Sequence, residues 1–134
     1  MRLSPWHPTS SSSDLRSRAG LSPKHHVFQE LLEVILASPV LSIYGFYCHA
    51  GQSYASTSLD EATQFLSAEL QAVNDATEIA MSVISRTNTV SPKTPFVLSV
   101  GSTPTAHAAT PETKEKLRSS LNGELEIHAG VWDL

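Results

Sequence analysis

Residues 41–56, LSIYGFYCHAGQSYAS, change character half-way along. The first half contains Ile43 and Phe46 and is apolar and rich in aromatic residues, a composition typical of a buried strand. The second half is polar and places Tyr47 and Tyr54 in or beside a glycine-containing turn. Strands that end in such turns are where α/β proteins place ligand sites. An ordinary polar turn at a strand edge is the alternative interpretation.

Helical signals lie on both sides of this stretch. Ser22 and Pro23 predict an N-cap followed by proline at the first helical position, so we expect a helix over residues 23–37. Residues 58–61, SLDE, form a capping-box pattern that opens a longer helix over residues 60–86. The apolar stripe of this second helix comprises Ala62, Phe65, Leu66, Leu70, Val73, Ala76, Ala80, Val83 and Ile84.

Two further strands are predicted in the second half of the chain. Residues 95–101, PFVLSVG, form an apolar run that ends in a polar turn, and residues 124–128 end in the same way. A short helix over residues 111–119 separates them. With the first strand over residues 41–48, strands alternate with helices, which indicates a parallel sheet with right-handed crossovers. The expected fold class is therefore α/β, with about three parallel strands and flanking helices.

The polar turns after the three strands should lie close together. In a parallel sheet the carboxyl ends of all strands lie on one side, so residues 49–54, 101–105 and 128–130 are expected to converge on one rim. Glycine N–H groups and the hydroxyls of Ser102, Thr103 and Thr105 are groups that bind phosphate or carboxylate. Taken by itself, the GSTPT turn is also compatible with a plain connection.

The composition of the 134-residue chain narrows the classes of function. A net charge of −4 gives no electrostatic footprint for nucleic acid or an anionic membrane, and no apolar run approaches the ~20 residues of a membrane span. The single cysteine, Cys48, excludes an internal disulfide, so a reducing, cytoplasmic location is expected. Residues 1–17 contain a serine run and are expected to be disordered; a transit peptide is the alternative.

Three motifs, GFYCHAGQSYAS, SVGSTPT and LEIHAG, resemble in order and separation the fungal-type D-serine dehydratase family. That family is related to D-threonine aldolases and alanine racemases. The resemblance, which extends from about Arg18 to Gly130, implies that residues 18–134 are part of an alanine-racemase-like (β/α)₈ TIM barrel that binds pyridoxal 5′-phosphate (PLP). It also implies a zinc-binding β domain and a homodimer in full-length members, and the conversion of D-serine, a small D-amino acid, to pyruvate and ammonia.

Four residues match cofactor-binding positions of the family, and they are Tyr47, Tyr54, Thr103 and Gly130. The resemblance implies that the two tyrosines line the cofactor, that the threonine belongs to the second turn, and that the glycine lies near the phosphate. His49 and His128 belong to the matched motifs, but the resemblance gives neither a chemical role.

The chain also departs from the family pattern. The lysine that binds the cofactor is expected upstream, near the first strand of the barrel, whereas the lysines here lie in predicted helices or a linker, at Lys24, Lys93, Lys114 and Lys116. The zinc pair, a histidine and a cysteine two residues apart, is absent. Where the family continues HAG-Asn-Tyr, residues 131–134 read VWDL. We therefore predict no catalytic residue and no metal ligand in this chain.

Two functions compete on this basis. The first is a fragment of a PLP-dependent D-serine dehydratase that is inactive in isolation. The second is a non-catalytic protein of the same barrel that binds a phosphate-bearing ligand or a partner strand. A lysine-bearing strand upstream and a His-x-Cys downstream in the same reading frame would favour the first. Because three strands leave both sheet edges unpaired, we also expect marginal stability, with partial exposure of Ile43, Phe46, Val97 and Leu98.

Overall fold

The computed structural model describes residues 20–49, 57–101 and 110–128, with the side chains of residues 113, 116 and 117 excepted. Its elements follow in the order α1 (His26–Leu36), β1 (Gly45–Cys48), α2 (Leu59–Thr87), β2 (Val97–Val100), α4 (Pro111–Arg118) and β3 (Glu124–Ile127). The three strands form one sheet in the order β1-β2-β3, and both neighbouring pairs are parallel. The predicted alternation of helices with parallel strands is confirmed.

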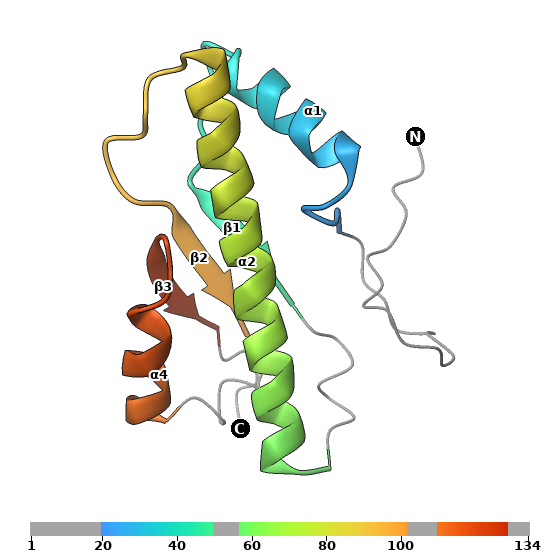
Figure 1. Cartoon of the computed structure of the whole chain (residues 1–134), viewed down its shortest axis with the longest axis vertical. Coiled ribbons are helices and arrows are strands. Elements are labelled where there is room, and N and C mark those ends of the chain that lie inside the picture. The colour runs from blue at the N-terminus through green and yellow to red at the C-terminus, as the bar shows by residue number, and fades with distance from the viewer. Residues whose placement is uncertain (1–19, 50–56, 102–109, 129–134) are drawn as a thin grey trace, which may run out of the picture.

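Figure 1 shows that α2 crosses one face of the sheet and runs antiparallel to the strands. Helix α1 packs beside the second half of α2, and α4 lies beside β3. All three strands point towards the end of the molecule at which α2 begins. That end carries the carboxyl termini of the strands, and we call it the rim. None of the helices in the described part of the chain is both long and apolar enough to cross a membrane.

Local signals at both ends define α2. The Ser58 Oγ accepts a hydrogen bond from the Glu61 N–H at 3.2 Å, as the capping-box pattern predicts. The Glu61 carboxylate accepts from the Thr57 N–H at 2.8 Å, one residue before the position that a standard capping box uses. The helix ends at Asn88, whose left-handed backbone (φ 52°) lets its N–H donate to the carbonyls of Ile84 and Ser85.

The core lies between α2 and the sheet. The inward stripe of α2 recurs at helical spacing and meets strand side chains that alternate along β1, β2 and β3. Leu98 and Val100 of β2 are fully buried there, and Leu66 and Val73 of α2 are nearly so. Leu32 brings α1 onto the same cluster. The partly buried residues that complete it are Phe28, Leu36, Ile43, Phe46, Cys48, Ile79, Leu121, Leu125 and Ile127.

The expected start of α1 is wrong by three residues. Ser22 is not the N-cap, because the His25 N–H donates to the Ser22 carbonyl at 3.0 Å and closes a turn ahead of the helix. His25 takes the capping role, and its Nδ1 accepts a hydrogen bond from the Val27 N–H at 3.3 Å. The helix therefore covers His26–Leu36 rather than residues 23–37.

The strands are shorter than the apolar runs that predict them. Pairing of β1 with β2 begins at Gly45, opposite Val97, so residues 41–44 stay outside the strand although they continue the apolar run. Ile43 and Phe46 are partly exposed, as expected. The same expectation is wrong for Val97 and Leu98, which are 9% and 0% exposed. Leu98 is buried because it packs against α2 in the core cluster, and both residues lie on the central strand, between the side chains of β1 and β3.

Candidate functional site

The face of the sheet that points away from α2 is polar near the rim. The parallel register places Tyr47, Ser99 and Glu126 side by side on adjacent strands. Successive side chains of a strand point to opposite faces, so His49 and His128 lie on this face too. We call these five residues, Tyr47, His49, Ser99, Glu126 and His128, the rim cluster.

His49 joins the end of β1 to the end of β2. Its Nδ1 lies 3.3 Å from the Gly101 carbonyl oxygen, and its ring stacks on that of Tyr47 with centroids 6.2 Å apart. The Tyr47 ring in turn meets His128 edge-on at 5.6 Å. Three rings from two non-adjacent strands thus lie in a row, with Tyr47 between the two imidazoles.

Gly101 allows β2 and β3 to end close together. Its φ of 114° lies in a region that residues with a side chain rarely adopt, and a Cβ at this position would lie 2.7 Å from the His128 carbonyl oxygen. The backbone beside it is held by a hydrogen bond from the His128 N–H to the Val100 carbonyl at 2.8 Å. The glycine at the end of β2 is therefore required for the geometry of the rim.

Glu126 connects the hydroxyl and imidazole groups of the rim cluster. Its Oε1 accepts a hydrogen bond from the Ser99 hydroxyl at 2.8 Å and lies 2.6 Å from the His128 Nε2. The hydrogen bond from Ser99, and then the one from His128, lower the pKa of the Glu126 carboxyl. Both bonds end on one carboxylate oxygen, so the Ser99 hydroxyl is bonded to Glu126 and not to the His128 imidazole. The arrangement is therefore not a nucleophile activated by a base.

Cys48 lies at the end of β1 but on the face towards α2. Burial, and then the negative charge of the nearby Glu69, raise the pKa of the Cys48 thiol to about 11. Glu69 belongs to the inward stripe of α2 and is only 1% exposed. The thiol is therefore protonated at neutral pH, which makes it a poor nucleophile and metal ligand. Within the described ranges, no three His, Cys, Asp or Glu residues are grouped so that they could hold a metal ion.

Of the four predicted cofactor-binding residues, the structure describes Tyr47, which is 61% exposed in the rim cluster. Tyr54, Thr103 and Gly130 lie outside the described residues. His49, Gly101 and His128, the first residues of the three predicted turns, do meet at the rim.

Sequence reasoning missed two residues of the rim cluster, Ser99 and Glu126. The signal that could have found them is the period-two pattern of the strands. A serine interrupts the apolar run of β2, and Glu126 alternates with apolar residues two positions before His128.

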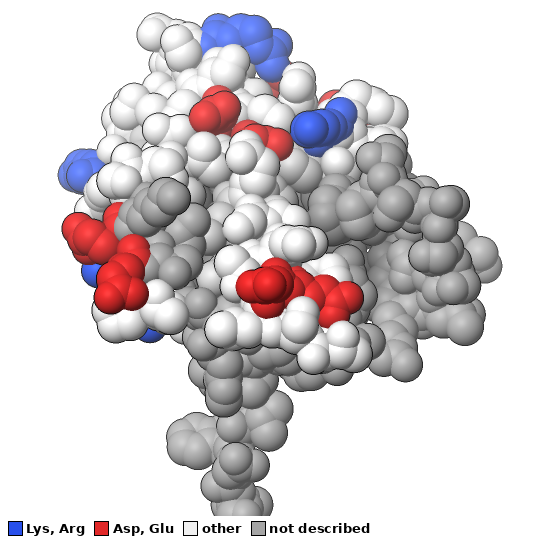
Figure 2. All heavy atoms as spheres, turned by 60° about the horizontal axis from the view of Figure 1, so that its bottom comes forward, with Lys and Arg blue, Asp and Glu red and all other residues white. Residues whose placement is uncertain are grey.

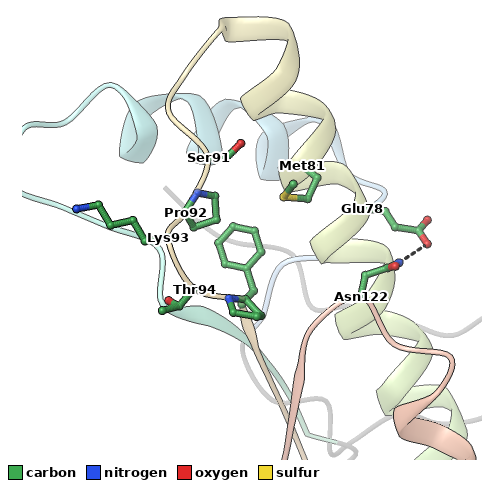
Figure 3. Close-up of a pocket in the computed structure, with 9 residues that line it drawn as sticks. Glu78, Met81, Ser91, Pro92, Lys93, Thr94 and Asn122 are labelled. Carbon is green, nitrogen blue, oxygen red and sulfur yellow. Dashed lines mark hydrogen bonds between the residues drawn. The ribbon is translucent and has the colours of Figure 1, made fainter.

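None of the lysines whose side chains are described belongs to the rim cluster. Lys93 lies in the linker that leads into β2, at the amino end of the sheet, so the prediction places it in the right segment. It helps to line an open hollow of about 650 Å³ with Met81 and Phe96, and its side chain extends away from Met81 (Figure 3). Lys24 precedes α1 and Lys114 lies on α4.

The charge distribution around the rim is mixed. Figure 2 brings this end of the molecule forward and shows acidic side chains in small groups, with Lys and Arg scattered singly among the described residues. That face carries no basic stripe of the kind that tracks a nucleic-acid backbone, as far as the described residues show.

Comparison with known proteins relates the chain to one enzyme. No protein-family model matches the sequence. The chain is 46% identical over 118 residues to the D-serine dehydratase of Schizosaccharomyces pombe, an alignment that covers 87% of this chain and 26% of the yeast protein. This chain is a homologue of D-serine dehydratases. The enzyme of Saccharomyces cerevisiae with the same name is 36% identical over 120 residues, covering 84% of this chain and 27% of that protein.

A solved structure extends the similarity to the fold. The crystal structure of an alanine racemase-like protein from Idiomarina loihiensis matches with a TM-score of 0.52 and 25% sequence identity. The match covers 90% of this chain and 26% of the bacterial one. The open, three-stranded sheet of the D-serine dehydratase homologue thus corresponds to part of an alanine racemase-like barrel. The chain spans about a quarter of the length of each relative.

Proposed function

We propose that this chain forms part of the cofactor pocket of a PLP-dependent D-serine dehydratase, which converts D-serine to pyruvate and ammonia. The observation that carries the proposal is the 46% identity over 118 residues to an enzyme of that name. The position of the rim cluster supports it, because ligands of parallel α/β proteins bind outside the carboxyl ends of the strands.

The described residues fit one part of a PLP site. Tyr47, His49 and His128 offer ring faces, edges and hydrogen-bonding atoms suited to a flat heteroaromatic ring. Glu126 is a carboxylate, whose charge disfavours direct contact with a phosphate group. We therefore propose that the rim cluster faces the ring end of the cofactor. The phosphate end is assigned to Thr103 and Gly130, and Tyr54 to the wall of the pocket; these three residues lie outside the described part of the chain.

The chemistry of the reaction needs more than these residues. PLP supplies the electron sink when it is bound, and a lysine attaches it to the enzyme. In this chain Tyr47 and the two imidazoles bind and orient a ligand, and the apolar layer beneath them positions the strands. Because no described lysine sits in the rim cluster, we propose that the chain has no dehydratase activity in isolation.

We propose that residues 18–134 correspond to a partial PLP-binding barrel domain; residues 1–17, for which the sequence predicts disorder, lie outside the described residues. The zinc ligands of the family are absent from this chain, and the homodimer is proposed for full-length members. We propose a cytoplasmic location, which is compatible with the free thiol of Cys48.

A PLP-binding experiment tests the proposal, with a matched pair of tyrosine variants. The purified chain is titrated with PLP and followed by absorbance, then reduced with borohydride, and labelled lysines are mapped by mass spectrometry; pyruvate release from D-serine is assayed in parallel. We expect weak, non-covalent binding that Tyr47→Ala reduces several-fold. Tyr44→Ala is the control, because Tyr44 is also exposed and lies before β1, away from the rim.

Two outcomes would contradict the proposal in different ways. Equal binding by the Tyr47→Ala and Tyr44→Ala chains would remove the rim cluster from the cofactor site. Stoichiometric labelling of one lysine together with pyruvate release would show that the chain is an active enzyme by itself.

The second candidate function is a non-catalytic protein that binds a phosphate-bearing ligand or a partner strand. The observation that favours it is the sheet itself, in which β1 and β3 each pair on one side only among the described residues. An exposed strand edge is a template for pairing with another chain. Concentration-dependent association of the purified chain, with no effect of PLP, would favour this candidate over the first.

A further inference from the structure

We infer that Glu126 is a positioning residue: it fixes His128 in the Nε2–H tautomer, which leaves Nδ1 as a hydrogen-bond acceptor at the rim. In the function proposed above, His128 contacts the ligand and the charge of Glu126 disfavours a phosphate group, but the effect of Glu126 on His128 has no part in it. The ring nitrogen of His128 that carries the proton determines which kind of ligand group this side chain can meet.

The contact between the two side chains decides the tautomer. His128 Nε2 lies 2.6 Å from Glu126 Oε1, within the range of a strong hydrogen bond to a charged acceptor. An ionised carboxylate only accepts hydrogen bonds, so the proton of the pair must sit on Nε2. A neutral imidazole carries one N–H, and its second nitrogen is then an acceptor.

Ser99 holds the carboxylate in the place that this pairing needs. Its hydroxyl donates to the same Oε1 at 2.8 Å from the central strand. Ser99 and Glu126 are partners in the strand register, so the backbones of β2 and β3 fix the spacing of the two side chains. Ser99 is 9% exposed, which keeps its hydroxyl directed at the acid rather than at water.

The backbone and the ring of His128 are each held by a further contact. The backbone N–H of His128 donates to the Val100 carbonyl at 2.8 Å, and the Tyr47 ring meets the imidazole edge-on at 5.6 Å. The two nitrogens of an imidazole point in divergent directions, so a ligand that meets Nδ1 does not compete with Glu126 for Nε2. The positioning is therefore compatible with ligand binding.

The tautomer selects the chemical class of the ligand group. An unprotonated Nδ1 pairs with a donor, such as an ammonium or a hydroxyl group, and not with a carboxylate or phosphate oxygen. The negative charge of Glu126 adds to this preference, because it also favours a cationic group. An amino acid with a hydroxyl side chain, such as D-serine, carries both kinds of donor; this identification of the ligand rests on the proposed function, whereas the tautomer does not.

Nitrogen NMR on the labelled chain tests the inference directly. Two-bond ¹⁵N–¹H spectra, recorded at a pH at which the imidazole is neutral, distinguish the two tautomers of His128. We expect the Nε2–H form in the unmodified chain. In Glu126→Gln the side-chain amide offers a donor as well as an acceptor, so the ratio of the two tautomers should move towards Nδ1–H by about tenfold, the effect of losing a hydrogen bond to a charged group.

The matched control is Glu124→Gln, which makes the same charge change on the same strand and the same face, two residues before Glu126. It should leave the tautomer ratio of His128 unchanged. Ser99→Ala is the second variant, and it should move the ratio in the same direction by a smaller factor; it also decides the matter if Glu126→Gln does not fold. An Nδ1–H tautomer in the unmodified chain, or equal ratios in the Glu126→Gln and Glu124→Gln variants, would overturn the inference.

Two ligand titrations separate this inference from the proposed function. D-serine should move the Nδ1 resonance of His128 more than inorganic phosphate does at the same concentration. A larger effect of phosphate, or no movement with either, would overturn the preference for donors at Nδ1. The tautomer measurement uses neither PLP nor turnover, so a failure of the dehydratase proposal leaves its result unchanged.

Discussion

The two faces of the sheet are built from the same short strands and yet do different work. On the face towards α2, Phe46, Leu98 and Ile127 belong to the core cluster. On the opposite face, Tyr47, Ser99 and Glu126 share one register and form polar and aromatic contacts. Adjacent residues therefore belong to different systems, since a strand alternates its side chains. The difference teaches that the hydrophobic core and the rim cluster can be changed separately, by single substitutions one residue apart.

The largest expected effect falls on the helix side of the sheet. Leu98→Ala should lower the free energy of unfolding by about 2–5 kcal/mol, because it removes a fully buried side chain and leaves a cavity. Chemical denaturation followed by circular dichroism measures the change. Tyr47→Ala, on the exposed face, is the comparison and should cost much less. Similar losses for both variants would show that the two faces are not energetically distinct.

The same face gives the second prediction, through the Cys48 thiol. Its pKa rises in the folded chain to about 11 from an ordinary 9.0, so its contribution to stability is full below pH 9 and is lost as the pH rises towards 11. A rise in the thiol pKa from 9.0 to about 11 corresponds to at most about 3 kcal/mol of folding free energy. Unfolding should be measured across this range for the unmodified chain and for Cys48→Ala. The alkaline loss should be smaller in the variant; parallel curves would contradict the burial of the thiol.

The third prediction concerns Gly101, which follows the central strand β2 and lies against the backbone of His128. Gly101→Ala should destabilise the chain by about 1–3 kcal/mol, because its backbone is in a strained region for alanine and the new Cβ would overlap the His128 carbonyl. The substitution should also disturb the contact between His49 and the Gly101 carbonyl, visible as a shift of the His49 ring signals. Gly20→Ala is the control, since a Cβ there meets nothing within 4 Å. Equal stability of the two variants would show that the rim tolerates a side chain at position 101.

The sequence predicts the features of this fold that depend on neighbouring residues. Ser58 and Asn88 mark the ends of α2 because capping signals act within a few residues. The alternation of strands and helices along the chain predicts the parallel sheet, because a helix between two strands returns the chain to the end at which the next strand must start. The start of β1 is harder to predict, because it depends on where β2 begins to pair. The start of α1 is also harder to predict, because a short polar side chain such as that of Ser22 is equally suited to a turn and to a helix cap, and here Ser22 lies in a turn.

The candidate site shows the same division. Its place at the carboxyl rim could be predicted, and Tyr47 is found there. The pairing of Ser99 with Glu126 could not, since it joins residues 27 positions apart and depends on the register of β2 against β3. A register is a property of tertiary packing, and a shift of one residue would turn Glu126 to the other face.

The smallest expected effect concerns the polar face. The Ser99 and His128 hydrogen bonds lower the pKa of Glu126 in the folded chain, so the stability it contributes is present above its ordinary value of 4.5 and is lost as the pH falls through the lowered value. Denaturation of Glu126→Gln and Glu124→Gln should be compared between neutral and acid pH. Only Glu126→Gln should reduce the loss of unfolding free energy at acid pH (the acid limb of the stability curve). The reduction should be modest, because the carboxylate is exposed to solvent. If both variants flatten it equally, the acid limb reports general charge rather than the bonds to Ser99 and His128, and the polar face then has no ordered network of its own.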